Sequence, residues 1–192
     1  MQALFENFQK YVPFSEEEMI MILSRVRRIP IKRRQKILQE GDVCKHYSFV
    51  LEGCFRMYGI DDKGYEHNIQ FAAENDWIAD IGSFYAKKTS KLYIEAIEPS
   101  SILQIEQQDL YALYTKIPKL SIAFKIIIEN KYVELQNRVL QNFSSTAQQR
   151  YLYFLEQYPY LSNRLPNTQI ASYMGITPEF LSKIRKDLSK KG

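Results

Sequence analysis

The sequence is poor in the residues that build metal and redox sites. Among its 192 residues are two cysteines, Cys44 and Cys54, and two histidines, His46 and His67. Two thiols are too few for a four-ligand zinc or iron–sulfur site, and two histidines cannot supply the imidazoles of a metal-dependent jelly-roll enzyme. We therefore expect no metal cofactor, both thiols buried as apolar side chains, and both histidines as ordinary polar residues of a sheet.

Long apolar runs and recognisable catalytic groupings are also missing. No apolar run reaches the roughly 18 residues needed to span a bilayer, and the first residues lack the features of a signal peptide. We therefore expect a cytoplasmic protein with no membrane partner and no structural disulfide. No Ser-His-Asp grouping, phosphate loop or pair of catalytic carboxylates stands out. An enzyme is not expected.

The excess positive charge lies in the last quarter of the chain. The net charge is +4, but residues 1–142 contain 19 basic and 19 acidic side chains. Residues 143–192 therefore hold all of the excess, with seven basic side chains against three acidic ones. Such asymmetry indicates a polyanion as partner of that quarter.

The first 118 residues are predicted to be rich in β-structure. A helix is expected after Ser15, which is followed by three glutamates of a first helical turn. Short apolar segments bounded by turn residues then follow, and the tetrad 61–64 ends in glycine as a hairpin loop does. The segments are 36–40, 47–51, 55–58, 65–71, 92–97 and 102–105. Their number and spacing predict an α+β protein with an N-terminal antiparallel jelly roll.

Residues 120–142 contain no glycine or proline and predict a helix of roughly 35 Å. This helix has two neighbouring apolar stripes. We expect one stripe to pack on its own domain and the other on a second copy of the chain, although a helix lying across a monomer core is the alternative. The residues assigned to the dimer contact are Ile122, Ile126, Ile127, Val133 and Leu140. The predicted parts are a sensor domain (1–118), a dimerisation helix (119–142) and a DNA-binding domain (143–192).

Residues 167–189 predict a helix-turn-helix. Asn167 or Thr168 is expected to cap a short helix, and Gly175 permits the sharp turn that follows. Thr177 as N-cap, Pro178 as first helical residue and Glu179 in the first turn open the second helix. Its buried face is expected at Leu181, Ile184 and Leu188. The alternative, an ordinary packed helix pair with a solvated outer face, explains the combined spacing less well.

The outer face of the second helix is polar and mostly basic, as a helix in the major groove requires. Glu179 could accept a hydrogen bond from cytosine, and Lys183 could donate to guanine. Arg185, Lys186 and Lys190 are expected to reach phosphates. The complete predicted DNA-binding set is Thr168, Gln169, Thr177, Pro178, Glu179, Ser182, Lys183, Arg185, Lys186 and Lys190.

With these parts in this order, the chain resembles the Crp/Fnr family of bacterial transcription regulators over nearly its whole length. The landmarks are the segments 38–42, 47–53 and 76–84. The resemblance implies a cyclic-nucleotide-binding-type jelly roll and a homodimer on a near-palindromic operator. It also implies signal transmission through the long helix, and a contact with RNA polymerase if the protein is an activator. The sequence ends at Gly192, so we expect no full wing hairpin after the second helix.

The resemblance fails where a cyclic nucleotide would bind. Members that bind one use a Gly-Glu pair and an Arg-Ser pair, whose positions hold Ala79-Asp80 and Ser90-Lys91 here. No guanidinium is available for the phosphate, and Lys91 is one residue late, which in a strand points it to the other face. We therefore do not expect cAMP. A pocket for another effector is expected at Asp80, Ile81, Gly82, Ser83, Ser90 and Lys91.

Two further readings follow from the resemblance. The oxygen-sensing branch uses an N-terminal cysteine cluster, which residues 1–43 lack, so an iron–sulfur sensor is not expected. A small-molecule sensing module with weak or vestigial DNA binding is the main alternative to a sequence-specific regulator.

Overall fold

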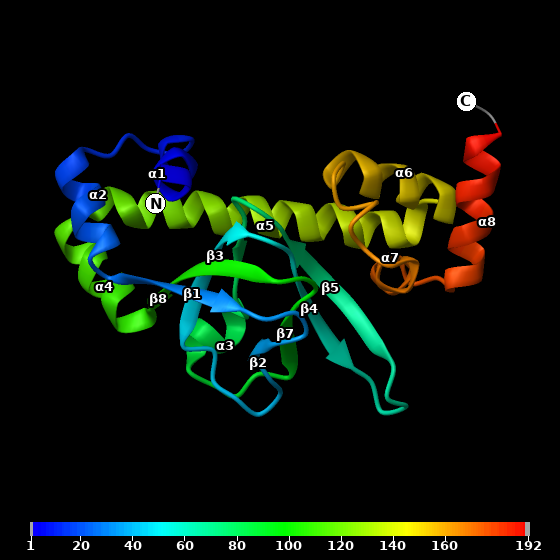
Figure 1. Ribbon diagram of the computed structural model, residues 1–192, viewed down its shortest axis with the longest axis horizontal. Coiled ribbons are helices and arrows are strands. Elements are labelled where there is room, and N and C mark those ends of the chain that lie inside the picture. The colour runs from blue at the N-terminus through cyan, green and yellow to red at the C-terminus, as the bar shows by residue number, and fades with distance from the viewer. Residues whose placement is uncertain (1, 191–192) are drawn as a thin grey trace. The chain divides into compact units, whose positions relative to one another are not determined.

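Two four-stranded antiparallel sheets form the jelly roll of the computed structural model, which describes residues 2–190 (Figure 1). One sheet has the order β1-β8-β3-β6 and the other β2-β7-β4-β5. The strands are β1 (Val26–Ile31), β2 (Lys36–Leu38), β3 (His46–Glu52), β4 (Phe55–Ile60), β5 (Glu66–Ala72), β6 (Trp77–Ile78), β7 (Leu92–Ala96) and β8 (Ser100–Glu106). All six predicted strands are present, and the predicted fold class is confirmed.

Strand β1 was not among the predicted strands, because its sequence contains a proline and two adjacent arginines. The strand lies at the edge of its sheet and pairs only with β8, with Val26 opposite Ile105 and Pro30 opposite Ser101. Proline is tolerated at a sheet edge, where its missing N–H breaks no inner ladder. The proline therefore marks an edge strand and not a loop.

Two glycines set tight turns between strands. Gly53 joins β3 to β4 at φ +95°, and a Cβ atom there would lie 2.1 Å from Oγ of Ser100. Gly64, at φ +83°, closes the β4–β5 hairpin, where Oδ1 of Asp61 accepts from the backbone N–H groups of Lys63 and Tyr65. The hairpin predicted at 61–64 is confirmed.

An aromatic cluster covers one face of the β1-β8-β3-β6 sheet. Trp77 lies 5.1 Å from Phe49, 5.4 Å from Tyr47 and 5.0 Å from Phe124, measured between ring centroids. All four side chains are buried. The Trp77 indole donates to Oδ1 of Asn7, so its one polar atom is satisfied inside the core.

Helices lie before, between and after the strands of the roll, and aromatic side chains of three of them, Phe8, Phe84 and Phe124, pack against this face. They are α1 (Gln2–Gln9), α2 (Glu16–Leu23), α3 (Ile81–Ala86), α4 (Gln107–Lys116) and α5 (Pro118–Ser144). Ser15 and Glu18 form a capping box at the start of α2, which confirms the predicted N-cap. Helix α5 exceeds the predicted 120–142 by two residues at each end. Helices α1 and α4 were not predicted from the sequence.

Three helices follow α5: α6 (Ala147–Gln157), α7 (Asn167–Met174) and α8 (Pro178–Ser189). The chain divides into two units, one of residues up to 58 with 71–131 and one of residues 59–70 with 132–192. The tip of the β4–β5 hairpin thus belongs with the C-terminal helices. Across residues 2–190, no helix is both long and apolar enough to cross a membrane.

Candidate DNA-binding interface and sensor pocket

The turn between α7 and α8 has the predicted geometry. Gly175 ends α7 at φ +65°, and Ile176 N–H donates back to the Ala171 carbonyl at 3.0 Å. Thr177 caps α8, its hydroxyl accepting from Phe180 N–H at 3.2 Å, and Pro178 is the first helical residue. The start of α8 is therefore set by three features: the left-handed conformation of Gly175, the N-cap Thr177 and the proline at the first helical position.

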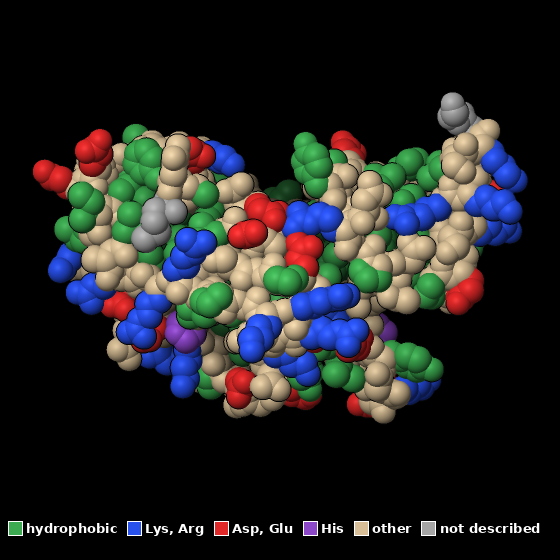
Figure 2. Space-filling view, in the orientation of Figure 1, with side chains coloured by type: hydrophobic (Ala, Val, Ile, Leu, Met, Phe, Trp, Pro, Cys, Tyr) green, Lys and Arg blue, Asp and Glu red, His purple; other side chains and the backbone are tan. Residues whose placement is uncertain are grey.

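The outer face of α8 is exposed along its length. In Figure 2, Lys and Arg side chains gather over α8 at the right of the view. The exposed members of the predicted set on this helix are Glu179, Ser182, Lys183, Lys186 and Lys190. Leu181 and Ile184 lie buried on the opposite face, against α7. The helix therefore presents a mostly cationic surface, with one acid, Glu179, in its first turn and a second, Asp187, near its end.

Arg185 does not lie on that surface. Its Nε donates to the Tyr151 hydroxyl at 2.7 Å, its Nη1 to Oδ1 of Asn167 at 2.5 Å, and its Nη2 to the Ser162 carbonyl at 2.8 Å. The guanidinium thus ties α8 to α6, to the loop after α6 and to the start of α7. This geometry argues against the predicted phosphate contact, because every nitrogen atom is already used inside the domain.

The start of α7 also departs from the prediction. Asn167 is the first helical residue and does not cap the helix; the N-cap is Pro166, which makes no side-chain cap bond. The Asn167 side chain accepts from Arg185 instead. Thr168 is exposed, as expected of a DNA contact.

Gln169, another predicted DNA contact, is held by the β4–β5 hairpin. Nδ2 of Asn68 donates to the Gln169 backbone carbonyl at 2.9 Å and to its Oε1 at 2.7 Å. Beside it, the Ser172 hydroxyl accepts from Asn68 N–H and donates to the Glu66 carbonyl. Asn68 is buried, so these bonds are shielded from water. The hairpin therefore uses the side chain that the sequence assigned to DNA.

Arg138 of α5 completes this contact. Its guanidinium donates to the carbonyls of Asn68, Ile69 and Tyr173 and lies 3.9 Å from the centroid of the Tyr173 ring. One side chain thus joins α5, the hairpin and α7. The sequence analysis did not single out Asn68 or Arg138, because their hydrogen-bond partners lie far away in the chain.

Helix α5 exposes only part of the apolar set that the sequence assigned to dimerisation. Ile122, Val133 and Leu140 are 51%, 51% and 63% exposed, and Ile126 is half-buried. Ile127 is buried with Leu120, Ala123 and Phe124 on the other stripe, so its assignment to a dimer contact is wrong. It belongs to the core of its own unit.

The turn where a cyclic nucleotide would bind is occupied by the protein's own carboxylate. Asp80 caps α3, with Oδ1 accepting from Ser83 N–H at 3.1 Å and Oδ2 accepting from the Ser90 hydroxyl at 2.6 Å. Lys91 is exposed while Ser90 is buried, as the strand offset predicts. A cyclic phosphate would bring a second negative charge beside Asp80 with no guanidinium at either position, so these residues do not fit it.

The remaining residues of this turn serve its structure. The Ser83 hydroxyl donates to the Lys88 carbonyl at 2.6 Å and accepts from Cys44 N–H at 2.8 Å. Ile81 and Gly82 form the first turn of α3. The structure thus brings Asp80, Ser83 and Ser90 together as predicted, but binds them to one another.

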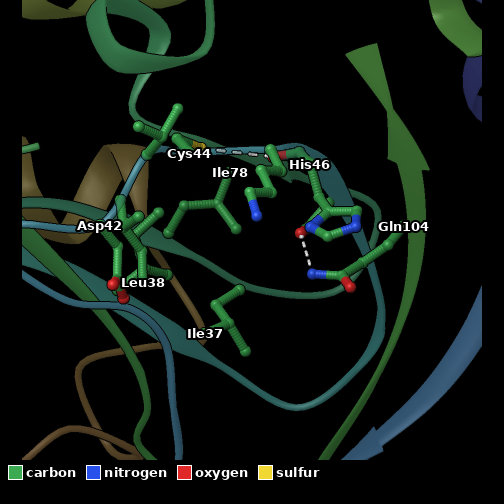
Figure 3. Close-up of a pocket in the computed structure, with 11 residues that line it drawn as sticks. Ile37, Leu38, Asp42, Cys44, His46, Ile78 and Gln104 are labelled. Carbon is green, nitrogen blue, oxygen red and sulfur yellow. Dashed lines mark hydrogen bonds between the residues drawn. The ribbon is translucent and has the colours of Figure 1, made fainter. Parts of the chain in front are cut away.

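A cavity of about 320 Å³ lies instead between the two sheets of the roll. Figure 3 shows Ile37 and Ile78 reaching into it between Asp42 and Leu38 on one side and His46 and Gln104 on the other. Burial lowers the pKa of His46, and burial raises the pKa of the neighbouring Cys44 thiol to about 11. Both cysteine side chains are buried, as predicted.

No motif in the sequence indicates this cavity. It is lined by side chains from five strands and from the loop before β3. The segments that line the cavity are not related by any sequence motif, so the cavity becomes visible only when the sheets have folded.

Comparison with known proteins agrees with this architecture. Residues 28–116 match the family described as cyclic nucleotide-binding domain. The regulatory protein HlyX of Actinobacillus pleuropneumoniae is 25% identical over 96% of this chain and 82% of its own length. The electron transport regulator A of Shewanella oneidensis is 24% identical over 86% of this chain and 70% of its own. The structure of FixK2 from Bradyrhizobium japonicum superposes with a TM-score of 0.76 at 18% identity, covering 87% of this chain and 86% of that one.

The fold and these relatives agree on one class of protein. The described chain has a cyclic-nucleotide-binding-type jelly roll followed by a C-terminal helix-turn-helix, and it is similar to transcription regulators of the Crp/Fnr type.

Proposed function

We propose that the protein is a homodimeric regulator that binds a near-palindromic DNA operator and does not respond to cyclic nucleotides. The observation that supports it most is the exposed cationic face of α8 on a capped helix-turn-helix. A dimer presents two such helices, and each reads the major groove of one half-site. The protein would act on cytoplasmic DNA, with RNA polymerase as a partner if it activates.

Within α8, position along the helix divides the roles. Glu179, Ser182 and Lys183 lie in the first two turns, which meet base edges when a recognition helix enters the groove. Thr168, Thr177 and Pro178 lie at the starts of α7 and α8, and we assign them to contacts with the sugar-phosphate backbone of the DNA. Lys186 and Lys190 lie toward the far end and supply charge for phosphates. Arg185 supports the domain from inside, and Gln169 becomes available only when Asn68 releases it.

The spacing on α5 supports the dimer. Alternating steps of four and three residues link seven positions, the pattern of a two-stranded coiled coil. Five are apolar, and Phe143 is 86% exposed at the end of the row. The seam, as we call this row, consists of Ile122, Ile126, Glu129, Val133, Gln136, Leu140 and Phe143. Exposed apolar side chains in this pattern are expected to be covered by the same helix of a second protomer.

Fluorescence anisotropy with the protein's own upstream DNA tests the proposal. We expect one duplex segment to bind at least a thousandfold more tightly than random duplex at physiological salt. Equal affinity for all duplexes, at every salt concentration, would favour the second candidate, a sensing module with vestigial DNA binding. The cavity in the roll is the observation that favours this second candidate, because a sensing module needs a place for its ligand. Native mass spectrometry of freshly purified protein would then show a retained metabolite.

A cyclic nucleotide provides a separate check. Addition of cAMP or cGMP is expected to leave both the operator affinity and the melting temperature unchanged, because Asp80 already holds Ser83 N–H and the Ser90 hydroxyl. A saturable rise in melting temperature would contradict this part of the proposal.

A further inference from the structure

One large apolar side chain at the start of α8 lies outside the core. Phe180 is the third residue of the helix, and 47% of its surface is exposed. Among residues 2–190, no other aromatic ring contacts it. Its backbone N–H donates to the Thr177 hydroxyl at 3.2 Å, so the helix cap fixes the place of the residue. A single exposed phenylalanine is common on protein surfaces, so its position decides what it can do.

Phe180 stands between the buried face and the cationic face of α8. At about 100° per residue, it lies about 40° from Ile184, which is buried, and about 60° in the other direction from Lys183, which is exposed. Residues three positions apart on a helix are neighbours on its surface. The ring therefore borders the part of α8 that we assign to base edges.

The side of α8 that carries Phe180 is not suited to phosphates. The ring has no hydrogen-bond donor for a phosphate oxygen. Seven residues further on, and only about 20° away around the helix, Asp187 is exposed. Its carboxylate opposes the approach of a second negative charge along this side. An exposed ring here is therefore expected to meet the bases and not the backbone.

The major groove offers an apolar group for such a ring. Thymine carries a methyl group at C5, whereas the other three bases are recognised there by their hydrogen-bond donors and acceptors. Phenylalanine can use neither donors nor acceptors, but it can pack against the methyl group. Removing a methyl group from water in this way is favourable. Thymine is therefore the base that suits Phe180.

We propose that Phe180 is a specificity-determining residue that packs against the 5-methyl group of one thymine in each half-site. Lys183 lies about 4.5 Å further along the helix axis, and base pairs are about 3.4 Å apart. The thymine is therefore expected within about two base pairs of the base that Lys183 contacts. This role rests on the proposed function, because it needs a specific operator.

Exchange of thymine for deoxyuridine in the operator tests the contact, because the exchange removes only the methyl group. Each thymine is exchanged in both half-sites at once, and fluorescence anisotropy measures the affinity of the full chain. We expect one symmetric pair of positions at which binding weakens about fourfold for each methyl group, or roughly fifteenfold for the pair. Unchanged affinity at every position would overturn the proposal.

Variants of Phe180 assign the effect to the ring. Phe180→Ala is expected to bind the thymine and deoxyuridine operators equally. Phe180→Leu keeps a smaller apolar side chain and should show a reduced preference, which decides the matter if Phe180→Ala does not fold. Leu152 of α6 is 46% exposed, so Leu152→Ala is the matched control and should keep the full preference. An undiminished preference in the Phe180 variants would show that another side chain reads the methyl group.

A second base separates the methyl group from the rest of thymine. Cytosine at the contacted position is expected to weaken binding, and 5-methylcytosine should recover about fourfold for each half-site. The recovery should be absent in Phe180→Ala, and no recovery in the parent protein would contradict the contact. Specific binding without any methyl effect would overturn the role of Phe180 alone. If no duplex binds more tightly than random DNA, the proposed function fails as well.

Discussion

Lys183 and Lys190 lie on the same exposed face of α8, nearly two helical turns apart. A lysine near the start of a recognition helix meets base edges, whereas one near its end meets the backbone. We therefore expect Lys183→Ala to reduce discrimination between operator variants by about 1–3 kcal/mol. Lys190→Ala should instead weaken binding to all duplexes alike. Anisotropy against a set of single-base operator variants measures both, and identical profiles for the two variants would contradict the division.

Arg185 is a basic residue of α8 whose hydrogen bonds stabilise the domain itself. Its three hydrogen bonds go to Tyr151, Asn167 and Ser162, and two of these acceptors belong to other helices. We expect Arg185→Ala to lower the free energy of unfolding by about 2–4 kcal/mol, because partners are left unsatisfied in a partly buried place.

Urea denaturation followed by circular dichroism measures this change. Lys186→Ala, at the next position but exposed, is the control and should shift the free energy of unfolding by less than about 0.5 kcal/mol. A loss of DNA affinity in Arg185→Ala without a loss of stability would restore Arg185 to the phosphate contacts.

At the scale of the element, the seam on α5 contains two polar positions, Glu129 and Gln136. In a parallel pair of helices, Glu129 would face the same residue of the second protomer, and like charges oppose association. We expect Glu129→Leu to tighten the dimer and Leu140→Asp to weaken it, each by at least tenfold in dissociation constant. Sedimentation equilibrium over a concentration series measures both.

Leu135→Asp is the matched control for that measurement. Leu135 is also an exposed leucine of α5, but five residues place it about 140° around the helix from Leu140. The control should associate like the parent protein. A Leu135→Asp variant that dissociates while Leu140→Asp does not would put the contact on a different face.

The contact between the β4–β5 hairpin and α7 can also be tested. Arg138 donates to three carbonyls there and stacks on Tyr173. Arg138→Lys keeps the charge but loses the planar fork, and we expect faster amide hydrogen exchange in α7 by tenfold or more. Exchange in α3 should not change, since α3 lies in the other unit. Unchanged protection of α7 would mean that packing alone holds the hairpin.

The elements differ in how far their sequence determined them. Helix α8 was predicted with its cap, because Thr177 and Pro178 act only on residues next to them in the sequence. Strand β1 was missed, because Pro30 is tolerated only through its place at the sheet edge, which depends on β8. Asn167 was assigned as a cap from local preference, yet the long-range bond from Arg185 decides its role.

The same distinction applies to the candidate sites. The exposed face of α8 follows from helical periodicity, so its residues could be named from the sequence. The loss of the cyclic-phosphate site could also be expected, since Asp80 and Ser90 stand where other residue types are needed. The cavity at Ser48 and Gln104 could not, because it exists only where five strands converge.

For the whole molecule, the salt dependence of operator affinity tests the role of α8 and the dimer together, because its slope counts the phosphate contacts of both protomers. If Lys186 and Lys190 of each protomer neutralise phosphates, a dimer makes roughly four such contacts, and log affinity should fall with log salt at a slope of about −3.6. From 50 to 200 mM salt, that slope corresponds to a loss of roughly 100-fold. Lys190→Ala should halve the slope, because each dimer loses two contacts.

Leu140→Asp should also halve the slope, but for a different reason: a single protomer then binds a single half-site, and the total affinity falls with it. A slope that stays near its parent value in a verified monomer would show that one protomer makes all of the phosphate contacts. Recognition would then depend on a surface other than two copies of α8 spaced by about 34 Å along the duplex.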